Sequence, residues 1–152
     1  MVRDWADGEN LGKDNYYKAK RTTDREKTES LRLQIKLAFD MLDCAGFPIL
    51  YNETAEADDI LATLAYTFRK KANVIVHLHT RDKDCAQLMV YPNVWIEHPK
   101  VGNEKARTLK TREDCIAVYG VPPESIVDYL VMLGDSADNI PGIPGIGAAK
   151  AV

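Results

Sequence analysis

The sequence has few cysteines and no closely spaced cysteine pair. Cys44, Cys85 and Cys115 form an odd set at wide spacing, with no C-x-x-C motif. This spacing indicates neither a disulfide framework nor a zinc knuckle. We therefore expect three reduced thiols.

Long apolar runs and a strong net charge are also missing. No stretch approaches the roughly 20 consecutive apolar residues of a membrane span, and no apolar signal region follows the charged start of the chain. The net charge is −3, from 20 Lys and Arg against 23 Asp and Glu, and alone it does not indicate a nucleic-acid partner. With 152 residues, 45% of them hydrophobic, the composition predicts one cytoplasmic globular domain with no membrane partner.

The charged residues are unevenly distributed along the chain. Between Lys13 and Lys36 there are eight basic residues and four acidic ones. The acidic residues gather in three short segments, Glu56-Ala57-Asp58-Asp59, Asp82-Lys83-Asp84 and Asp135-Ser136-Ala137-Asp138. This segregation is the first indication of function.

The hydrophobic pattern of the first half predicts alternating helices and strands. Apolar residues recur at intervals of three and four over 24–45, which is typical of an amphipathic helix. A short apolar run at 49–51 predicts a buried strand, 57–71 a second helix, and the β-branched run 74–79 a strand of a parallel sheet. Strand, helix and strand then form a βαβ unit.

The second half predicts a hairpin followed by helices. A short helix ends at Leu88, and strands at 94–97 and 107–109 flank a Gly102-Asn103 turn. Two helices follow, one from Thr111 to Gly120 and one over 122–133, and the tail begins a further helix.

Each acidic segment lies where a parallel α/β sheet places its ligands, after a strand or at a helix end. Converging carboxylates would repel one another unless bound cations offset the charge. Oxygen ligands without His or Cys indicate Mg²⁺ or Mn²⁺, and two such ions are a common device for hydrolysing a phosphodiester.

Structural roles are open alternatives for these residues. Asp58 and Asp59 could simply complement a helix dipole, Asp84 could be an N-cap, and Asp135 with Asp138 could form turns. His77 and His79 have no third partner in the sequence. We expect them to be buried or edge histidines and not metal ligands.

The tail carries a second kind of motif. Ile143-Pro144-Gly145-Ile146-Gly147 followed by Ala148-Ala149-Lys150-Ala151 fits a helix-hairpin-helix turn. In such a turn, glycines allow backbone N–H groups to approach a DNA phosphate, which is a contact to the backbone and not to the bases. A plain loop is the alternative.

The three acidic segments and the glycine-rich tail, in this order, closely resemble the family of 5′-to-3′ exonucleases and flap endonucleases. The nearest likeness is to the 5′-nuclease domain of bacterial DNA polymerase I and its stand-alone phage relatives. The segment Tyr17-Lys18-Ala19-Lys20-Arg21 also matches the Y-K-x-x-R segment of that family, so the resemblance extends from Tyr17 to Val152.

The resemblance implies a fold and a domain division. It implies an α/β, PIN-like parallel-sheet nuclease core over 1–110, with a helical arch segment at about 13–36. It also implies the start of a C-terminal helix-hairpin-helix (H3TH) DNA-binding region over 111–152, with a potassium ion at the hairpin.

The resemblance also implies roles for individual residues. Two Mg²⁺ ions, for which Mn²⁺ can substitute, would be held by Glu56, Asp58, Asp59, Asp82, Asp84, Asp135 and Asp138. Lys18 and Arg21 would contact the phosphate to be cut, and with Asp59 and Asp84 they make up the expected catalytic residues. Lys18, Lys20, Arg21, Gly145, Ile146, Gly147 and Lys150 would bind DNA.

The implied function is a Mg²⁺-dependent, structure-specific 5′-to-3′ exonuclease or flap endonuclease acting in replication or repair in a bacterial or phage-infected cell. Its partners would be DNA with 5′ flaps, nicked or gapped duplexes and 5′ ends. The alternatives are a non-catalytic or truncated relative that grips duplex DNA through the hairpin, and a PIN-type ribonuclease, which leaves the hairpin unexplained.

The sequence departs from the family pattern at both ends. No apolar strand with a metal-binding Asp precedes Tyr17, and Asp4 lies only near the expected position of a second early Asp. Ala149-Lys150 stands where relatives tend to have Lys-Thr, and the chain stops inside the second hairpin helix. We therefore expect a piece of a longer nuclease, truncated at both ends, with a polymerase domain fused to the parent protein as one arrangement.

Overall fold

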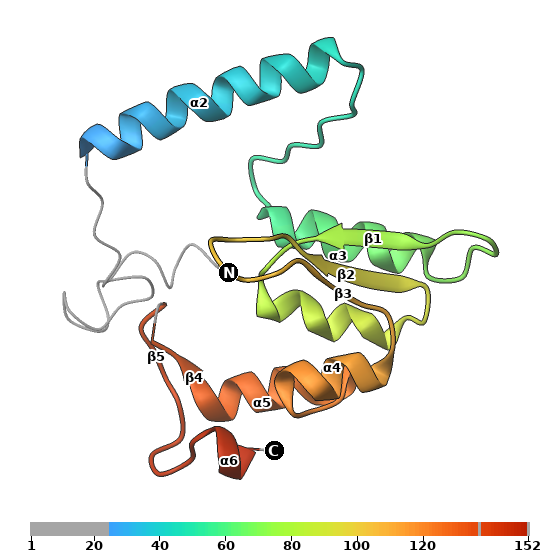
Figure 1. The fold of residues 1–152 in the computed structure, drawn as a ribbon, viewed down its shortest axis with the longest axis vertical. Helices are drawn as coiled ribbons and strands as arrows, with labels where there is room; N and C mark the ends of the chain where they lie inside the picture. Colours follow the sequence, from blue (N-terminus) through green and yellow to red (C-terminus); the bar gives the residue numbers. More distant parts are fainter. Residues whose placement is uncertain (1–24, 137, 152) are drawn as a thin grey trace. The chain divides into compact units, whose positions relative to one another are not determined.

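The computed structural model describes residues 25–136 and 138–151 (Figure 1). Helices and strands are mixed in it, as the predicted α/β class requires. The described residues divide into two compact units, 25–53 with Asp135–Pro141, and 54–134 with 142–151.

The first unit is built on α2, the helix Arg25–Cys44. This helix confirms the prediction for 24–45, and Gly46 follows it with a φ of 77° that favours glycine. Its apolar side chains are largely exposed, Leu31 by 55% and Ile35 by 44%. The strand predicted at 49–51 is wrong. Since no described strand pairs with this segment, its backbone lacks the neighbouring chain that a strand requires.

A three-stranded sheet is the centre of the second unit (Figure 1). Its strands are β1 (Val76–His79), β2 (Val94–His98) and β3 (Arg107–Leu109), in the order β1-β2-β3. β1 and β2 are parallel, with Leu78 opposite Ile96, and β2 and β3 are antiparallel. The predicted hairpin at Gly102 is confirmed, and that glycine has a φ of 56°.

The βαβ unit is wrong in its first strand, but a parallel pair is present. β1 and β2 are joined by η1, a 3₁₀ helix over Lys83–Val90, which replaces the short helix predicted to end at Leu88. α3 (Ala57–Phe68) precedes β1 and is shorter than predicted, since Arg69 is its C-cap.

The remaining helices lie close to the positions predicted from the sequence. α4 (Arg112–Tyr119) begins after the N-cap Thr111 and ends at Gly120, whose φ is 83°. The turn η2 (Pro123–Ser125) leads into α5 (Ile126–Leu133), and α6 (Ala148–Ala151) is the last helix of the described chain. A short ladder of β4 (Gly134–Asp135) and β5 (Ile140–Pro141) was not predicted.

The core of the second unit lies on one face of the sheet. Ile96 and Leu109 are fully buried among side chains of η1, α4 and α5, while Ala65 of α3 packs with Leu78 and Val94. Alternation along a strand sends His77 and His79 to the other face. Both lie on the edge strand β1 and are exposed, which confirms the prediction of edge histidines.

Candidate active site

The first acidic segment forms the N-terminus of α3. Glu56 is the N-cap, and Asp58 and Asp59 lie in the first turn. The Asp59 carboxylate accepts a hydrogen bond from the backbone N–H of Glu56 at 3.0 Å, which is half of a capping box. Asp59 thus has the helix-end role that the sequence left open, and all three side chains are exposed to solvent.

The second acidic segment follows the carboxyl end of β1. The Asp82 carboxylate accepts a hydrogen bond from the Asp84 backbone N–H at 3.0 Å, and the Asp82 N–H donates to the Thr80 hydroxyl at 3.0 Å. Asp82, and not Asp84, is the N-cap, because the 3₁₀ helix begins at Lys83, two residues earlier than a cap at Asp84 would require.

The charges of both segments act on the Cys85 thiol. It is 4% exposed, and its pKa is raised to about 11, first by burial and then by the charges of Asp58 and Asp82, with a smaller contribution from Asp84. Because α3 packs against η1, carboxylates from α3 and from the β1–η1 connection influence the same buried thiol. The sequence interpretation treated Cys85 only as an unpaired thiol, although its position beside Asp84 was a signal.

The donor chemistry of this cluster fits a hard divalent cation. Its ligands are carboxylate oxygens, which Mg²⁺ and Mn²⁺ prefer. As they stand, the side chains of residues 25–136 and 138–151 include no group of three His, Cys, Asp or Glu that encloses a metal ion. Asp58, Asp82 and Asp84 are all exposed to solvent.

The third acidic segment belongs to the first unit. The Asp138 backbone N–H donates to the Asp135 carboxylate at 3.3 Å, and Asn139 has a φ of 60° in the turn that leads to β5. The turn-forming role of Asp135 is therefore present. Its participation with Asp138 in a common site with Asp82 stays a prediction.

The glycine-rich tail contains a tight turn. The Ile146 N–H donates to the Ile143 carbonyl at 3.0 Å, and Gly145 has a φ of 80°. A Cβ added at Gly145 or Gly147 would meet no atom within 4 Å, so a ligand can approach this backbone closely. The Lys150 ammonium donates to the Gly145 carbonyl at 3.2 Å and thus contacts the turn itself.

Of the arch segment expected at about 13–36, residues 25–36 lie in α2. Lys18, Lys20 and Arg21, and also Asp4, lie outside the described residues.

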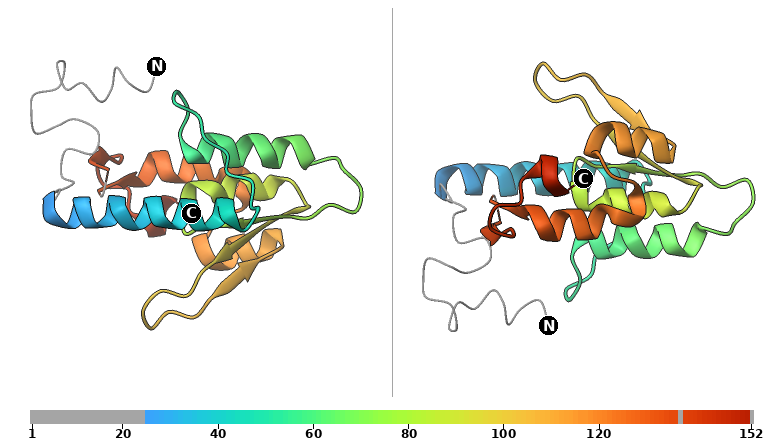
Figure 2. Two further views of the ribbon diagram at one scale, coloured as in Figure 1. Left: turned by 90° about the horizontal axis from the view of Figure 1, so that it is seen from above. Right: turned by 90° about the horizontal axis from the view of Figure 1, so that it is seen from below.

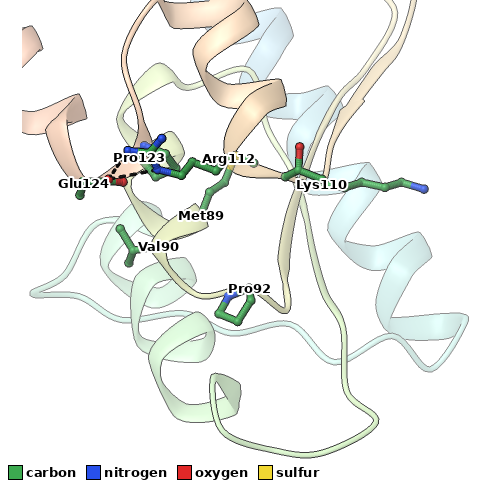
Figure 3. Close-up of a pocket in the computed structure, with 8 residues that line it drawn as sticks. Met89, Val90, Pro92, Lys110, Arg112, Pro123 and Glu124 are labelled. Atoms are coloured by element: carbon green, nitrogen blue, oxygen red, sulfur yellow. Dashed lines mark hydrogen bonds and ion pairs between the residues drawn. The ribbon is translucent and has the colours of Figure 1, made fainter.

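A shallow pocket lies elsewhere in the second unit (Figure 3). It has a volume of about 450 Å³ and is lined by the ion pair of Arg112 with Glu124 and by Met89, Val90, Pro92 and Lys110, among others. The Lys110 ammonium extends away from the other lining residues to the Trp95 ring, 4.4 Å from its centroid. None of the predicted site residues lines this pocket.

No single helix of the described chain is long and apolar enough to cross a membrane. Among the described residues, only α4 and the segment Pro123–Leu133 taken together have the length and apolar composition of a span, and this pair is bent by 50°.

Comparison with known proteins identifies a family for most of the chain. Residues 9–120 match the family described as "5'-3' exonuclease, N-terminal resolvase-like domain". The chain is 39% identical over 124 residues to a 5'-3' exonuclease of Aquifex aeolicus, covering 82% of this chain and 40% of that protein. It is 34% identical over 122 residues to a 5'-3' exonuclease of Buchnera aphidicola, with 80% and 40% coverage.

The likeness extends to a larger class of enzyme. The chain is 35% identical over 139 residues to DNA polymerase I of Pseudomonas aeruginosa, covering 90% of this chain and 14% of that protein. The chain thus spans less than half of the length of each of these relatives. By the match over 9–120, it belongs to the family of 5'-3' exonucleases, through their N-terminal resolvase-like domain.

Proposed function

We propose that this chain is part of a Mg²⁺-dependent, structure-specific 5′-to-3′ exonuclease or flap endonuclease that hydrolyses DNA phosphodiester bonds in replication or repair. The observation that carries the proposal is that Asp58, at the start of α3, and Asp82 and Asp84, after the carboxyl end of β1, all act on the buried Cys85 thiol. Enzymes with open α/β sheets bind their ligands at this end of the strands.

The proposed metal ligands are the carboxylates of both acidic segments of the second unit, Glu56, Asp58, Asp59, Asp82 and Asp84. On the strength of the family resemblance, Asp135 and Asp138 complete the set. Two Mg²⁺ ions, when bound, lower the pKa of a bound water and offset charge on the attacking and leaving oxygens. Mn²⁺ is the expected substitute.

The protein's own part is to position these groups. The Asp82 cap fixes the start of η1 and so determines where Asp84 projects, and the Asp59 cap fixes the first turn of α3. In a two-metal site small displacements of the ligands are costly, because the reacting atoms must be held close together. We assign these two hydrogen bonds that positioning role.

DNA contacts complete the proposal. Lys18, Lys20 and Arg21 would contact phosphates near the cut, and the amides of Gly145, Ile146 and Gly147, with Lys150, would hold the duplex in the start of an H3TH element with a potassium ion. Contacts of this kind read the phosphate backbone and favour substrates such as 5′ flaps, nicked or gapped duplexes and 5′ ends.

A DNA-binding relative without cleavage is the second candidate. It is favoured by the capping roles of Asp59 and Asp82, which give two of the carboxylates a purely structural use. The crowding of further acidic residues near a phosphate ligand argues against it, since such charges repel DNA unless cations are bound.

Cleavage of a labelled 5′-flap duplex by the full-length protein decides between them. Cleavage should require Mg²⁺ or Mn²⁺, stop in excess chelator, and be lost in Asp58→Asn. Asp128→Asn on α5 is the matched control and should cleave normally. Cleavage that persists in chelator, or in Asp58→Asn at the normal rate, would overturn the nuclease proposal.

A further inference from the structure

A group of basic and aromatic side chains lies at the same end of the sheet as the acidic cluster. The Thr80 N–H donates to the Glu97 carbonyl at 3.1 Å, so the chain leaves β1 beside the end of β2 and continues to Arg81. His98, the last residue of β2, is paired across the sheet with Arg107. Arg81, His98 and Arg107 therefore come from three neighbouring strand ends.

α4 contributes an aromatic residue to the group. The Tyr119 hydroxyl is 3.2 Å from Nε2 of His98, and the two rings meet edge to face at a centroid separation of 6.4 Å. Both residues are half-buried. Arg81 and Arg107, whose charges act on His98, are more exposed than this pair.

The two guanidinium groups act on the same neighbours. The pKa of His98 is lowered by burial and then by the charges of Arg107 and Arg81. A histidine so placed stays neutral at neutral pH and adds no third charge. The positive field is therefore that of the two arginines.

One carboxylate already lies in this field. Glu104 forms an ion pair with Arg81, and its pKa is lowered first by that hydrogen bond and also by the charge of Arg107. The Glu104 side chain is 68% exposed. It lies in the turn of the β2–β3 hairpin, which projects from the sheet in both views of Figure 2. A carboxylate held in this way can be displaced by another anion at little cost in packing.

This group borders the candidate active site. Arg81 directly precedes Asp82, and the pKa of Tyr119, raised to about 12 mainly by burial, is influenced by both Arg107 and Asp82. An anion bound between Arg81 and Arg107 would thus lie next to the carboxylates around Cys85.

We propose that Arg81 and Arg107 form a phosphate-binding subsite for the nucleic-acid strand that enters the candidate active site, and that Glu104 occupies this subsite until nucleic acid displaces it. The proposal rests on the proposed nuclease function. Arginine is suited to the role because its planar, permanently charged guanidinium binds phosphate oxygens in pairs. Glu104 would weaken the binding of competing anions. A nucleic-acid phosphate would then replace Glu104 in the ion pair with Arg81.

The test is equilibrium binding by the full-length protein, in chelator, of a fluorescent flap oligonucleotide at several salt concentrations. Arg81→Ala with Arg107→Ala should weaken binding by about tenfold and lower the slope of log K against log salt by about 1.4, because two phosphate contacts to a single strand are lost. Glu104→Gln should strengthen binding. Arg112→Ala, which breaks the surface ion pair with Glu124, is the matched control and should leave binding unchanged.

Oligonucleotides with and without a 5′ phosphate distinguish the two kinds of phosphate that the subsite could bind. A loss confined to 5′-phosphorylated oligonucleotides assigns the subsite to a terminal phosphate, and an equal loss with a 5′ hydroxyl assigns it to an internal phosphodiester. Unchanged affinity and salt slope in the double variant, or weaker binding by Glu104→Gln, would overturn the subsite.

The tests of the nuclease function and of the arginine subsite can be told apart. If Asp58→Asn loses cleavage while the double arginine variant binds normally, only the subsite is wrong. If Asp58→Asn still cleaves but the arginine variant loses affinity, the subsite stands as a nucleic-acid contact and the catalytic assignment falls.

Discussion

The Asp82 carboxylate accepts a hydrogen bond at 3.0 Å from the backbone N–H of Asp84, two residues further along the chain. One carboxylate of the pair is thereby held at the start of η1, while the other projects from its first turn. With Asp58, both act on the buried Cys85 thiol. Two acidic segments separated by more than twenty residues thus act on the same buried thiol.

The cluster should bind divalent cations and be stabilised by them. Mg²⁺ or Mn²⁺ at 100 times its dissociation constant should add about 2.7 kcal/mol to the free energy of unfolding, because the ion binds only the folded site. The midpoint of thermal unfolding, measured by calorimetry with and without the ion, should rise. Asp58→Asn with Asp84→Asn should reduce this rise, and Asp128→Asn should not. An unchanged midpoint at millimolar Mg²⁺ would show that these carboxylates do not share a cation.

Gly142 and Gly147 should respond differently to alanine. A Cβ at Gly142 would overlap the backbone carbonyl of Leu133, so Gly142→Ala should lower the melting temperature. Gly147 has open space, so Gly147→Ala should leave the melting temperature unchanged and weaken duplex DNA binding if a phosphate approaches this backbone. Thermal melts and binding assays on the same two variants check both effects. Equal destabilisation by the two would contradict this account of the turn.

The N-cap of α4 should contribute measurably to stability. The Thr111 hydroxyl accepts a hydrogen bond from the Asp114 N–H at 3.2 Å. Thr111→Ala should cost about 1 kcal/mol in the free energy of unfolding, as measured by urea titration. Thr67→Ala is the matched control. Its hydroxyl donates to the Thr63 carbonyl within α3, and alanine suits an exposed helix position, so the change there should be close to zero.

How far the sequence predicts the fold depends on whether an element is determined by its own residues or by pairing with a segment distant in the sequence. Thr111 and Gly120 each define a helix end through their own backbone and side chain, and both were predicted correctly. The hairpin at Gly102 is similarly local. The strand expected at 49–51 is wrong, because a strand also needs a neighbouring backbone, and hydrophobicity alone does not supply one.

The same distinction applies to the candidate site. The sequence predicts Asp58, Asp82 and Asp84 as a group, because strand ends of a parallel sheet gather at one edge. It could not show that Asp82, and not Asp84, caps η1, since this depends on the residue at which the helix begins. Arg107 was missed for another reason, because the predicted strand ended at 97, whereas β2 extends to His98, which pairs with Arg107.

Acid should remove one contribution that the exposed face of the sheet makes to the stability of the fold. His77 donates to the Glu97 carboxylate at 2.8 Å and His79 lies 3.2 Å from its other oxygen, and the hydrogen bond from His77 is the main cause that lowers the pKa of Glu97. A lowered folded pKa stabilises the fold above the unfolded value of about 4.3, and this stabilisation is lost as pH falls through the folded pKa.

The difference in melting temperature between the natural protein and Glu97→Gln tests this directly. It should be present at pH 6 to 7 and vanish in acid, when Glu97 is protonated. A difference that persists unchanged in strong acid would rule out the ionised carboxylate as its cause.

Cleavage and binding of a 5′-flap substrate by one double variant test the central claim most directly. In the full-length protein, Asp84→Asn with Asp138→Asn should abolish Mg²⁺-dependent cleavage while the affinity for the flap, measured in chelator, stays equal or rises. Each change removes a proposed metal ligand, and the loss of negative charge also lessens repulsion of the phosphates. Normal cleavage by this variant would contradict the two-metal nuclease account and leave DNA binding as the better assignment.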